Sequence, residues 1–464
     1  MAPTNPLDRV VDHVIHTRFE DLPQAVVDKT KTFLLDTLGV GIAGSAGAGI
    51  PELKQVAATW GAGDEATVWL TGERMPAQQA AVINAYQIHC LEFDCVHEGA
   101  VLHPMATILS AVMAWAEREK TRGRTIPGRD LITALALGVD VSTMLGIVTQ
   151  SPLRFFRPAT AGGFGAVVAI GKLAGFDALT LKNALGAQYS QTSGTLQPHV
   201  EGSPMLGLQV GFNARAAIVS TDLALAGFRG PHDILTGQYG YFALFEQNDY
   251  DLDPFLARLG QDWQMLEMSH KPYPSGRLTH GVVDGLGQMM REHGFAADDI
   301  AAIVCDVPPL VHRLVGRPDL ANPEANYAKL CLRFVAGVFL ARGRVDVPDF
   351  RGRAALDDPA VHRYAALVDV RLDDNPDQNA LDPQTITVRL KDGTAHQITL
   401  QHVYGHPRAA LTAQANIEKF RRCADYGVVS LPPAKADALI AAIDTLETHS
   451  DAASLVALTL VQPD

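Results

Sequence analysis

The stretch LLDTLGVGIAGS, residues 34–45, predicts a helix that packs closely against a neighbouring helix. Its apolar residues Leu34, Leu38 and Ile42 recur every four positions, which places them on one helix face. Small residues lie between them at Gly39, Gly41, Ala43 and Gly44. Because these positions carry little side-chain bulk, a second backbone can approach closely, and we expect a pair of buried helices here.

The same helical pattern extends over about residues 5–265, with Gly and Pro clusters between its segments. A second stretch rich in small residues, ATAGGFGAVVAIGKLAG at 159–175, is typical of another buried helix. A glycine-rich phosphate loop is the alternative, but the stretch has no GKS or GKT ending and does not fit G-x-G-x-x-G after a strand. The first half of the chain is therefore expected to be mainly helical.

Alternating apolar and polar residues appear between about residues 300 and 400. The clearest example is TITVRLKDGTAHQITL at 385–400, where Asp392 and Gly393 separate two alternating runs and predict a β-hairpin. Helical candidates near 280–293 and 323–342 accompany these strands, so a compact α+β unit is expected. Helical patterns return at 409–423 and 432–448. The fold class is therefore mainly α with an α+β second domain.

The composition excludes several kinds of partner. Of the 464 residues 47% are hydrophobic and 19% charged, which is typical of a folded protein large enough for two domains. The formal net charge of -13 repels nucleic acid and anionic membranes on average, and no Lys/Arg-rich tract offsets it. We expect no nucleic-acid or membrane partner, although a few cations focused in a cleft can still bind an anionic metabolite.

The cysteines and the N-terminus indicate the expected compartment. The five cysteines are odd in number and lack the paired spacing of a zinc site or a disulfide framework. We therefore expect free thiols in a reducing compartment. The N-terminal stretch has no apolar signal segment, and no run of about 18 apolar residues predicts a membrane span. The expected location is cytoplasmic.

Histidines and acids crowd NAYQIHCLEFDCVHEGAVLHP, residues 84–104, at a predicted helix end and the loop after it. They are His89, His97, His103, Glu92, Asp94 and Glu98. Polar capping of a helix terminus is one explanation, and a catalytic or binding site is the other. A metal site is a third, but the HExxH spacing is absent and no Cys pair joins the cluster, so no metal is predicted.

Cations lie in two further stretches. MSHKPYPSGRLTH at 268–280 places Lys271 and Arg277 in a proline-stiffened segment where the helical pattern gives way to the mixed one. Clefts between domains often bind ligands, although a linker with solvated cations is the alternative. In FFRPATAGGFGA, Arg157 stands at a predicted helix start, which favours anions, but an Arg there is often structural.

A polar, glycine-rich stretch, YSQTSGTLQPHVEGSPMLGLQVG at 189–211, contains His199 and Glu201. Its composition suits a loop that lines a cleft. His199 therefore joins the candidates for substrate binding.

Six stretches in order resemble the MmgE/PrpD family and together span almost the whole chain. They are LLDTLGVGIAG, HCLEFDCVHEGAVLHP, FRPATAGGFGA, YSQTSGTLQ, HKPYPSGRLTH, and GHP followed by the pair Lys419 and Phe420. The family includes 2-methylcitrate dehydratase, cis-aconitate decarboxylase and iminodisuccinate epimerase. The resemblance implies an all-helical domain, here discontinuous over 1–268 and 405–464, a smaller α+β lid domain with an antiparallel sheet over 269–404, and a homodimer.

The resemblance also implies chemistry without a cofactor. A base moves a proton on the carbon next to a carboxylate, and cations hold the carboxylates of the substrate. By motif position, Glu92 and Asp94 correspond to the family's paired acids, and His103 to the His of its His-Pro element. Lys271 corresponds to the Lys before its Tyr/Phe-Pro element.

These matches give a first assignment of roles. Lys271 and His103 are expected to act as base and acid, a role that requires Lys271 to be shielded from water. Glu92 and Asp94 are expected to orient the histidines or to exchange a proton with the substrate. The predicted substrate-binding residues are Arg157, Arg277, His89, His97 and His199.

The sequence departs from the family pattern at four positions. Arg157 replaces a His that precedes Pro-Thr in decarboxylase and dehydratase members, and Cys95 replaces the second acid after Asp94. Leu206 aligns with an active-site Lys, and Phe334 with the usual Tyr. These changes alter charge placement and proton delivery, which argues against a cis-aconitate decarboxylase or a standard 2-methylcitrate dehydratase.

The sequence leaves three functions open. We lead with a cofactor-independent, dehydratase-like lyase that acts on a small di- or tricarboxylate. The first alternative is an epimerase or racemase of a small dicarboxylate, because returning the proton to the other face follows the same abstraction. The second is a non-catalytic family member that binds carboxylates.

Overall fold

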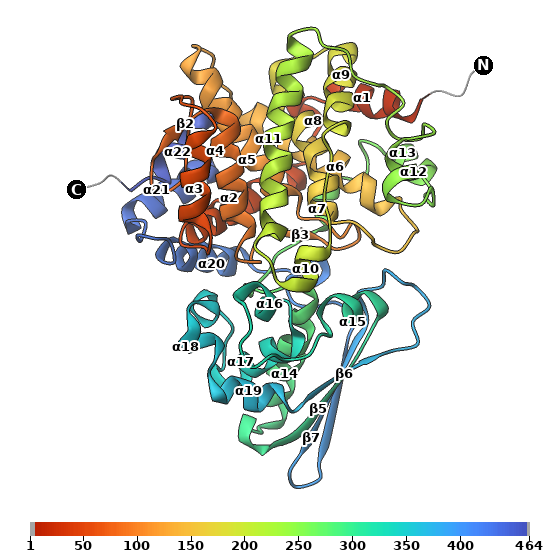
Figure 1. Cartoon of the computed structure of the whole chain (residues 1–464), viewed down its shortest axis with the longest axis vertical. Helices are drawn as coiled ribbons and strands as arrows, with labels where there is room; N and C mark the ends of the chain where they lie inside the picture. Colours follow the sequence, from red (N-terminus) through yellow and green to blue (C-terminus); the bar gives the residue numbers. More distant parts are fainter. Residues whose placement is uncertain (1–4, 462–464) are drawn as a thin grey trace.

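The computed structural model describes residues 5–461, which form two lobes stacked along the long axis (Figure 1). The larger lobe is helical and contains both ends of the described chain, whereas the smaller lobe combines helices with a sheet. The expectation of a mainly α protein with an α+β C-terminal part is therefore confirmed.

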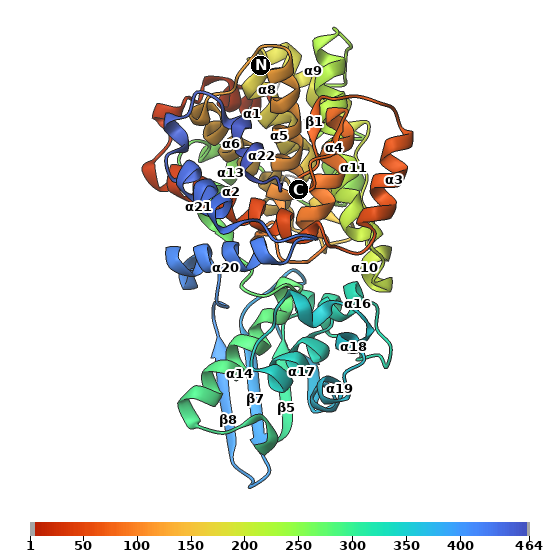
Figure 2. The same ribbon diagram turned by 90° about the vertical axis from the view of Figure 1, so that its left-hand side faces the viewer.

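The larger lobe is built from helices of both chain ends. From the N-terminal part they are α1 (Pro6–His16), α2 (Gln24–Gly44), α3 (Ile50–Thr59), α4 (Ala77–His89), α5 (Pro104–Thr121), α6 (Gly128–Ile147), α7 (Arg157–Thr160), α8 (Gly162–Ala174), α9 (Ala178–Tyr189), α10 (Gln197–Glu201), α11 (Met205–Leu225), α12 (Tyr241–Phe245) and α13 (Asp253–Ala257). From the C-terminal part they are α20 (Ala413–Asp425), α21 (Pro433–Asp444) and α22 (Leu455–Leu458). Helices α20 and α21 contact α2, and Figure 2 shows α20 along the lower edge of this lobe.

Close helix packing in this lobe depends on the small residues noted in the sequence. A Cβ atom at Gly39 would lie 2.7 Å from the ring of Phe420, so glycine is what allows α2 and α20 to touch. A Cβ atom at Gly44 would lie even closer to the carbonyl oxygen of Gln87 on α4. The glycine-rich stretch 159–175 forms the buried helix α8, with Gly165 against the backbone of Gly138 on α6, and not a phosphate loop.

Helix α6 is long and apolar enough to span a membrane by length and composition. However, 89% of its most apolar stretch is buried within the lobe, where it packs against α5 and α8. A buried core helix of a folded protein meets the same criteria of length and composition as a membrane span.

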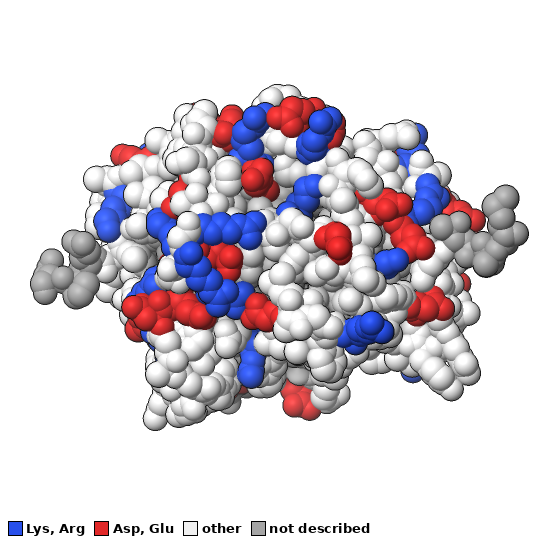
Figure 3. Space-filling view, turned by 90° about the horizontal axis from the view of Figure 1, so that it is seen from above, with Lys and Arg blue, Asp and Glu red and all other residues white. Residues whose placement is uncertain are grey.

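Figure 3 views the far end of the larger lobe, where basic and acidic side chains are interspersed and no continuous basic surface appears on that face.

The smaller lobe places helices against one face of a four-stranded sheet. Its helices are α14 (His280–His293), α15 (Pro309–Val315), α16 (Ala325–Lys329), α17 (Leu332–Arg342), α18 (Arg353–Leu356) and α19 (Pro359–Ala365). Its strands are β5 (Ile300–Val307), β6 (Val368–Leu372), β7 (Gln384–Leu390) and β8 (Ala395–Leu400).

The sheet has the order β6-β5-β7-β8. The predicted hairpin is confirmed as β7 and β8, which are antiparallel around the turn that contains Asp392 and Gly393. The expectation of an antiparallel sheet is wrong for one pair, because β5 and β6 run parallel. The helices α15–α19 connect these two strands, and a parallel pair requires such a long crossover. The predicted helix over 323–342 is divided into α16 and α17.

Short two-stranded pairs and single turns complete the structure. The strands are β1 (Ala66–Thr67) with β2 (Arg74–Met75), and β3 (Val96–His97) with β4 (Met268–Ser269). The 3-10 turns are η1 (Phe19–Asp21), η2 (Gln264–Glu267), η3 (Arg277–Thr279), η4 (Ala297–Asp299), η5 (Val347–Phe350), η6 (Pro407–Ala409), η7 (Leu446–Thr448) and η8 (Ala452–Ser454).

Two neighbouring chain segments join the lobes. Just after β4, the N–H of His270 donates a hydrogen bond of 2.9 Å to the carbonyl of Gly405, so the outgoing and returning segments lie side by side. The helices α20–α22 that follow share the hydrophobic core of the N-terminal helices, and a second core lies within residues 282–403. Pairing of β3 with β4 brings the loop after α4 to this junction.

Candidate active site

A cavity of about 90 Å³ lies where the two lobes meet. At roughly 10–15 Å³ per water-sized position, this volume has room for a small organic molecule. The polar and charged residues that line it are His89, Glu92, Glu98, His103, Arg157, His199 and Arg277. Asp94 and Lys271 lie directly behind this lining, and His97 lies outside it. The structure thus gathers eight of the nine candidate residues around one cavity.

Local backbone geometry positions the acid and histidine cluster. Helix α4 ends at His89, and the turn that follows passes through Glu92, whose φ of 52° lies in the left-handed region. Such strain in a residue other than glycine is typical of functional sites. His103 is the residue before Pro104, which begins α5 with the fixed φ that suits a first helical position. Both ends of the loop therefore rest on buried helices.

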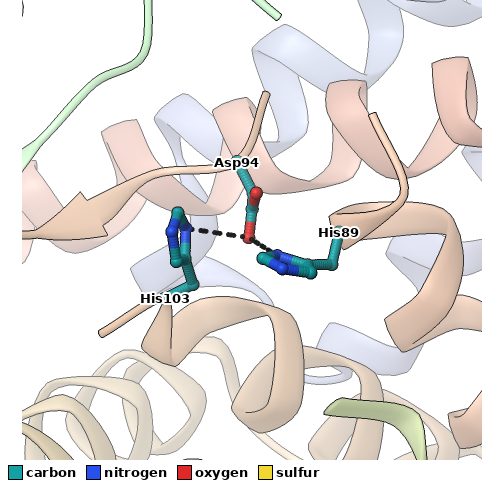
Figure 4. Close-up of side chains that lie close together, drawn as sticks. All are labelled: His89, Asp94 and His103. Carbon is teal, nitrogen blue, oxygen red and sulfur yellow. Dashed lines mark hydrogen bonds and ion pairs between the residues drawn. The ribbon is translucent and has the colours of Figure 1, made fainter. Parts of the chain in front are cut away.

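Asp94 lies between two imidazole rings and contacts both (Figure 4). Its Oδ2 atom is 3.0 Å from Nδ1 of His89 and 3.3 Å from Nδ1 of His103. The two rings meet edge to face, with centroids 4.9 Å apart. Burial raises the pKa of Asp94, but the two histidines outweigh burial and hold that pKa well below its ordinary value. Asp94 is therefore ionised.

His103 has the arrangement of a general base. Its Nδ1 faces two acceptors, the carbonyl of Cys95 at 3.0 Å and the carboxylate of Asp94, so Nδ1 carries the proton. Nε2 is left with its lone pair on a ring that lines the cavity. Burial lowers the pKa of His103, and Asp94 offsets this only in part. The neutral form is favoured, which is what proton abstraction requires.

The pKa of His89 is shifted in the opposite direction from that of His103. Its Nδ1 contacts Asp94, and its Nε2 lies 3.6 Å from Oε1 of Glu92. Burial lowers the pKa of His89, but these two carboxylates outweigh burial and raise it. His89 therefore favours the imidazolium form, and among residues 5–461 its Nε2 is buried without a hydrogen-bond partner.

Lys271 is fully buried and forms an ion pair with Glu92. Its Nζ donates to Oε2 of Glu92 at 2.8 Å and to the Glu92 carbonyl at 3.2 Å. Burial raises the pKa of Glu92, but Lys271 and the two histidines outweigh burial and lower it to about 2. Lys271 is shielded from water, as its expected role requires, but Glu92 stands between it and the cavity.

The two arginines that were expected to clamp carboxylates each have a partner in the protein. Nε and Nη2 of Arg157 bind both oxygens of Glu246 at 2.9 and 3.1 Å, and Nη1 donates to the Ala100 carbonyl at 3.3 Å. A guanidinium has five N–H groups, so two remain for a ligand. Arg277 binds Glu98 at 3.0 Å and donates to the carbonyls of Val403 and Tyr404.

The remaining histidines differ from each other. Nη2 of Arg317 donates to Nδ1 of His199 at 2.8 Å, so Nε2 of His199 carries the proton on a ring that lines the cavity. Burial, with a smaller effect from Arg317, lowers the pKa of His199 to about 4. His97 accepts from the Ala100 N–H and contacts Gln264, and it supports the β3–β4 junction without reaching the cavity.

The departures from the family pattern fall in different places. Leu206 lines the cavity, so this wall is apolar. Cys95 is buried beside Thr37, and burial raises the pKa of its thiol well above the ordinary value. Phe334 lies in the core of the smaller lobe against Phe350 and is not part of the cavity lining.

Three residues could in principle hold a metal ion. Ligand atoms of His89, Asp94 and His103 lie within 4.8 Å of one another. However, both Nδ1 atoms point at the same Asp94 oxygen at 3.0 and 3.3 Å, which are hydrogen-bond distances. Ligands of zinc converge on a common point about 2.0–2.2 Å from each donor atom. The geometry of these side chains fits a hydrogen-bonded triad better than a metal site.

Family comparison identifies the chain. The MmgE/PrpD N-terminal domain matches residues 8–253, and the MmgE/PrpD C-terminal domain matches residues 273–447. The chain belongs to the MmgE/PrpD family. It is thus an enzyme of the MmgE/PrpD type, as the six motifs implied.

Similarity to curated MmgE/PrpD proteins extends along nearly the full length. The cis-aconitate decarboxylase of Homo sapiens is 27% identical over 458 residues, which cover 94% of this chain and 91% of the relative. The cis-aconitate decarboxylase-like protein oryM of Aspergillus oryzae is 25% identical over 466 residues, which cover 94% of each chain.

Proposed function

We propose that this MmgE/PrpD protein is a lyase that needs no cofactor, removes a proton from the carbon next to a carboxylate and expels a β-substituent. The observation that carries the proposal is the pair His103 and His89, which share one carboxylate and have pKa values shifted in opposite directions. Environments that separate two pKa values in this way assign a base and an acid. The names of the relatives support a lyase that acts on carboxylates.

The mechanism follows from the free atoms of the cavity. The two unused N–H groups of Arg157 hold the substrate carboxylate. Nε2 of His103 takes the α-proton, the C–H electrons form the double bond, and the bond from the β-carbon to its hydroxyl oxygen breaks. Nε2–H of His89 protonates the leaving oxygen, so a β-hydroxy acid becomes an unsaturated acid and water. Proton exchange with solvent then restores both histidines.

Lys271 receives a different role from the one expected from the motif. Because Glu92 separates it from the cavity, we assign Lys271 as the cation that keeps Glu92 ionised. Glu92 in turn favours the imidazolium of His89. The ion pair therefore supports the acid without contacting the substrate.

Epimerisation is the second candidate, because a neutral and a protonated imidazole can remove and return a proton at one carbon. It requires the two carriers to reach opposite faces of that carbon, whereas the rings of His89 and His103 lie in edge-to-face contact with centroids 4.9 Å apart. A protein that only binds carboxylates would not need the opposite pKa shifts of His89 and His103.

The test is proton NMR in D2O with a panel of β-hydroxy, unsaturated and amino carboxylates. Wild-type protein is compared with His103→Gln and with His16→Gln, an exposed position on α1 that serves as control. Formation of an alkene only by wild type and the control supports the lyase. Deuterium at the α-carbon without loss of water or CO2 supports the epimerase. Binding without any exchange or turnover across the panel would falsify both.

The expectations of a lid, a homodimer and a small carboxylate substrate remain proposals. We propose that the smaller lobe covers the cavity, since it contributes Arg277 and Leu314 to the lining. Small-angle scattering with and without ligand tests closure, and sedimentation equilibrium tests the dimer.

A further inference from the structure

The last of the six motifs has no part in the proposed mechanism. It contains the pair Lys419 and Phe420 on α20, a helix of the larger lobe that follows the smaller lobe in the chain. Phe420 packs on α2 because Gly39 leaves room for its ring. This packing places Lys419, which is only 1% exposed, in the interior of the lobe. A buried ammonium group needs partners for its charge and its N–H groups.

Lys419 finds these partners on two other segments. Its Nζ lies 2.7 Å from Oδ1 of Asp36, which stands on α2 one helical turn before Gly39. The same Nζ donates to the carbonyl of Phe93 at 2.8 Å and lies 4.1 Å from the centroid of the Phe93 ring. One ammonium group thus connects α20 and α2 to the residue that precedes Asp94.

The chain on both sides of Asp94 is held by side chains. It forms no helix or strand from Phe93 to Cys95, so no regular ladder of hydrogen bonds fixes its backbone. Phe93 and Cys95 are both fully buried. Lys419 donates to the Phe93 carbonyl before Asp94, and His103 donates to the Cys95 carbonyl after it. The place of the Asp94 carboxylate therefore depends on these two donors.

Lys419 also balances a second acid near Asp94. Burial raises the pKa of Asp36, Lys419 lowers it, and the nearby Asp94 carboxylate raises it. Two buried carboxylates repel each other, and a cation beside one of them offsets that repulsion. Removing Lys419 would therefore disturb Asp94 in two ways, through the Phe93 backbone and through the charge of Asp36.

We propose that Lys419 and Asp36 are positioning residues that fix the Asp94 carboxylate between its two histidines. This inference rests on the proposed function, because the importance of Asp94 comes from the acid and the base that it connects. Neither Lys419 nor Asp36 lines the cavity, so neither contacts the substrate. Their effect reaches the reaction through Asp94, whose Oδ2 must stay near its distances of 3.0 and 3.3 Å from the two Nδ1 atoms.

The first experiment measures the pKa of His89 without turnover. Histidine labelled with 13C is titrated by NMR in wild type and in Lys419→Met, and His89→Gln assigns the signal. Asp94 has the larger of the two carboxylate effects that raise this pKa, so its displacement in Lys419→Met should lower the pKa by about one unit or more. The other charged or titratable neighbours of His89 are left unchanged; they are Glu92, His103 and Lys271.

Lys31→Met is the matched control. Like Lys419, Lys31 connects α2 to the C-terminal part of the chain, and its Nζ contacts a carboxylate and a carbonyl. These belong to Glu447 at 3.0 Å and Asp444 at 2.9 Å. Because this ion pair does not touch the loop that contains Asp94, the pKa of His89 should stay at its wild-type value.

A double variant separates positioning from stability. Lys419→Met combined with Asp36→Leu replaces the buried pair by apolar groups, which should recover much of the stability that Lys419→Met loses. The Phe93 carbonyl still lacks its donor, so the pKa of His89 should stay low. Lys419→Arg retains a cation with N–H donors and should restore part of the pKa. If Lys419→Met does not fold, the double variant decides.

Two results would overturn the inference. One is a wild-type pKa of His89 in folded Lys419→Met. The other is recovery of that pKa together with stability in the double variant, because the pair would then have a structural role alone.

Turnover separates this inference from the proposed function. In Lys419→Met, kcat should fall roughly 10- to 100-fold while KM changes little, because the groups that contact the substrate remain. If the pKa of His89 shifts as expected but wild type shows neither turnover nor deuterium exchange, the positioning role stands and the lyase proposal fails. If wild type reacts and Lys419→Met keeps both the pKa and kcat, the lyase proposal stands and the positioning role is wrong.

Discussion

His89 and His103 point their Nδ1 atoms at the same oxygen of Asp94, at 3.0 and 3.3 Å. One carboxylate thus connects two rings that differ in burial and in neighbouring charge. Glu92 adds a second carboxylate on the side of His89 only. This asymmetry shifts the pKa values of the two rings in opposite directions, and under the proposed mechanism it makes the reaction depend on pH.

We predict a bell-shaped dependence of kcat/KM on pH. The pKa of His103 is lowered from 6.5, so activity should rise as pH increases through that lower value and the base becomes neutral. The pKa of His89 is raised from 6.5, so activity should fall as pH increases through that higher value and the acid is lost. The apparent pKa values read from the two limbs of the pH profile describe the coupled pair of histidines, not either ring alone. A profile that is flat from pH 5 to 9 would contradict this assignment.

Asp94→Asn should reduce kcat by roughly 10²- to 10⁴-fold, the usual contribution of acid–base catalysis. Loss of the carboxylate also removes the main influence that raises the pKa of His89, so the alkaline limb should move to lower pH. Steady-state kinetics across pH measures both effects. Asp64→Asn, at an exposed position, is the matched control. An unchanged alkaline limb in Asp94→Asn would show that Asp94 does not set the acid.

Arg157→Met should destabilise the protein by about 3–5 kcal/mol, because it leaves the buried carboxylate of Glu246 without its cation. Combining it with Glu246→Leu should recover much of the stability, since replacing a buried pair by apolar groups is often neutral. Activity should remain lost in both variants if Arg157 holds the substrate carboxylate. Thermal unfolding and turnover are measured together. Recovered activity in the double variant would assign Arg157 a structural role alone.

Gly44→Ala should destabilise the larger lobe by about 1–3 kcal/mol or more, because the new methyl group would overlap the Gln87 carbonyl of α4. Gly287→Ala on α14 is the control, since its nearest neighbours are the flexible end of Arg291 at 3.2 Å and the ring of Phe339 at 3.4 Å. Chemical denaturation monitored by circular dichroism compares the two. Equal stability of both variants would refute the packing argument for α2 and α4.

Much of the fold was predictable because it depends on local patterns. The periodicity of 34–45 and the Asp392-Gly393 turn predicted α2 and the β7–β8 hairpin correctly. The parallel pairing of β5 with β6 was not predictable, because the strands are separated by some sixty residues and alternation does not encode direction. Strands that pair from distant parts of the chain leave no characteristic spacing in the sequence.

The site shows the same division. The cluster at residues 89–103 was visible because its members are close in sequence, whereas Glu246 and Arg317 were missed because each contacts a cavity-lining residue from a distant segment. Their contacts decide which hydrogen-bonding atoms of Arg157 and His199 are left for a ligand. The placement of Phe334 in a core shows that a motif alignment does not locate a side chain in space.

The two lobes contribute different kinds of residues to the cavity at their junction. The proposed acid and base, His89 and His103, lie at the end of α4 and just before α5, while Leu278, Leu314 and Leu330 come from the other lobe. Selection for a new substrate can therefore alter the smaller lobe while the acid and base stay in place. Mutant libraries confined to residues 278, 314 and 330 should therefore change substrate preference with few substitutions. Changes at these positions would also let related proteins on the same fold bind different substrates.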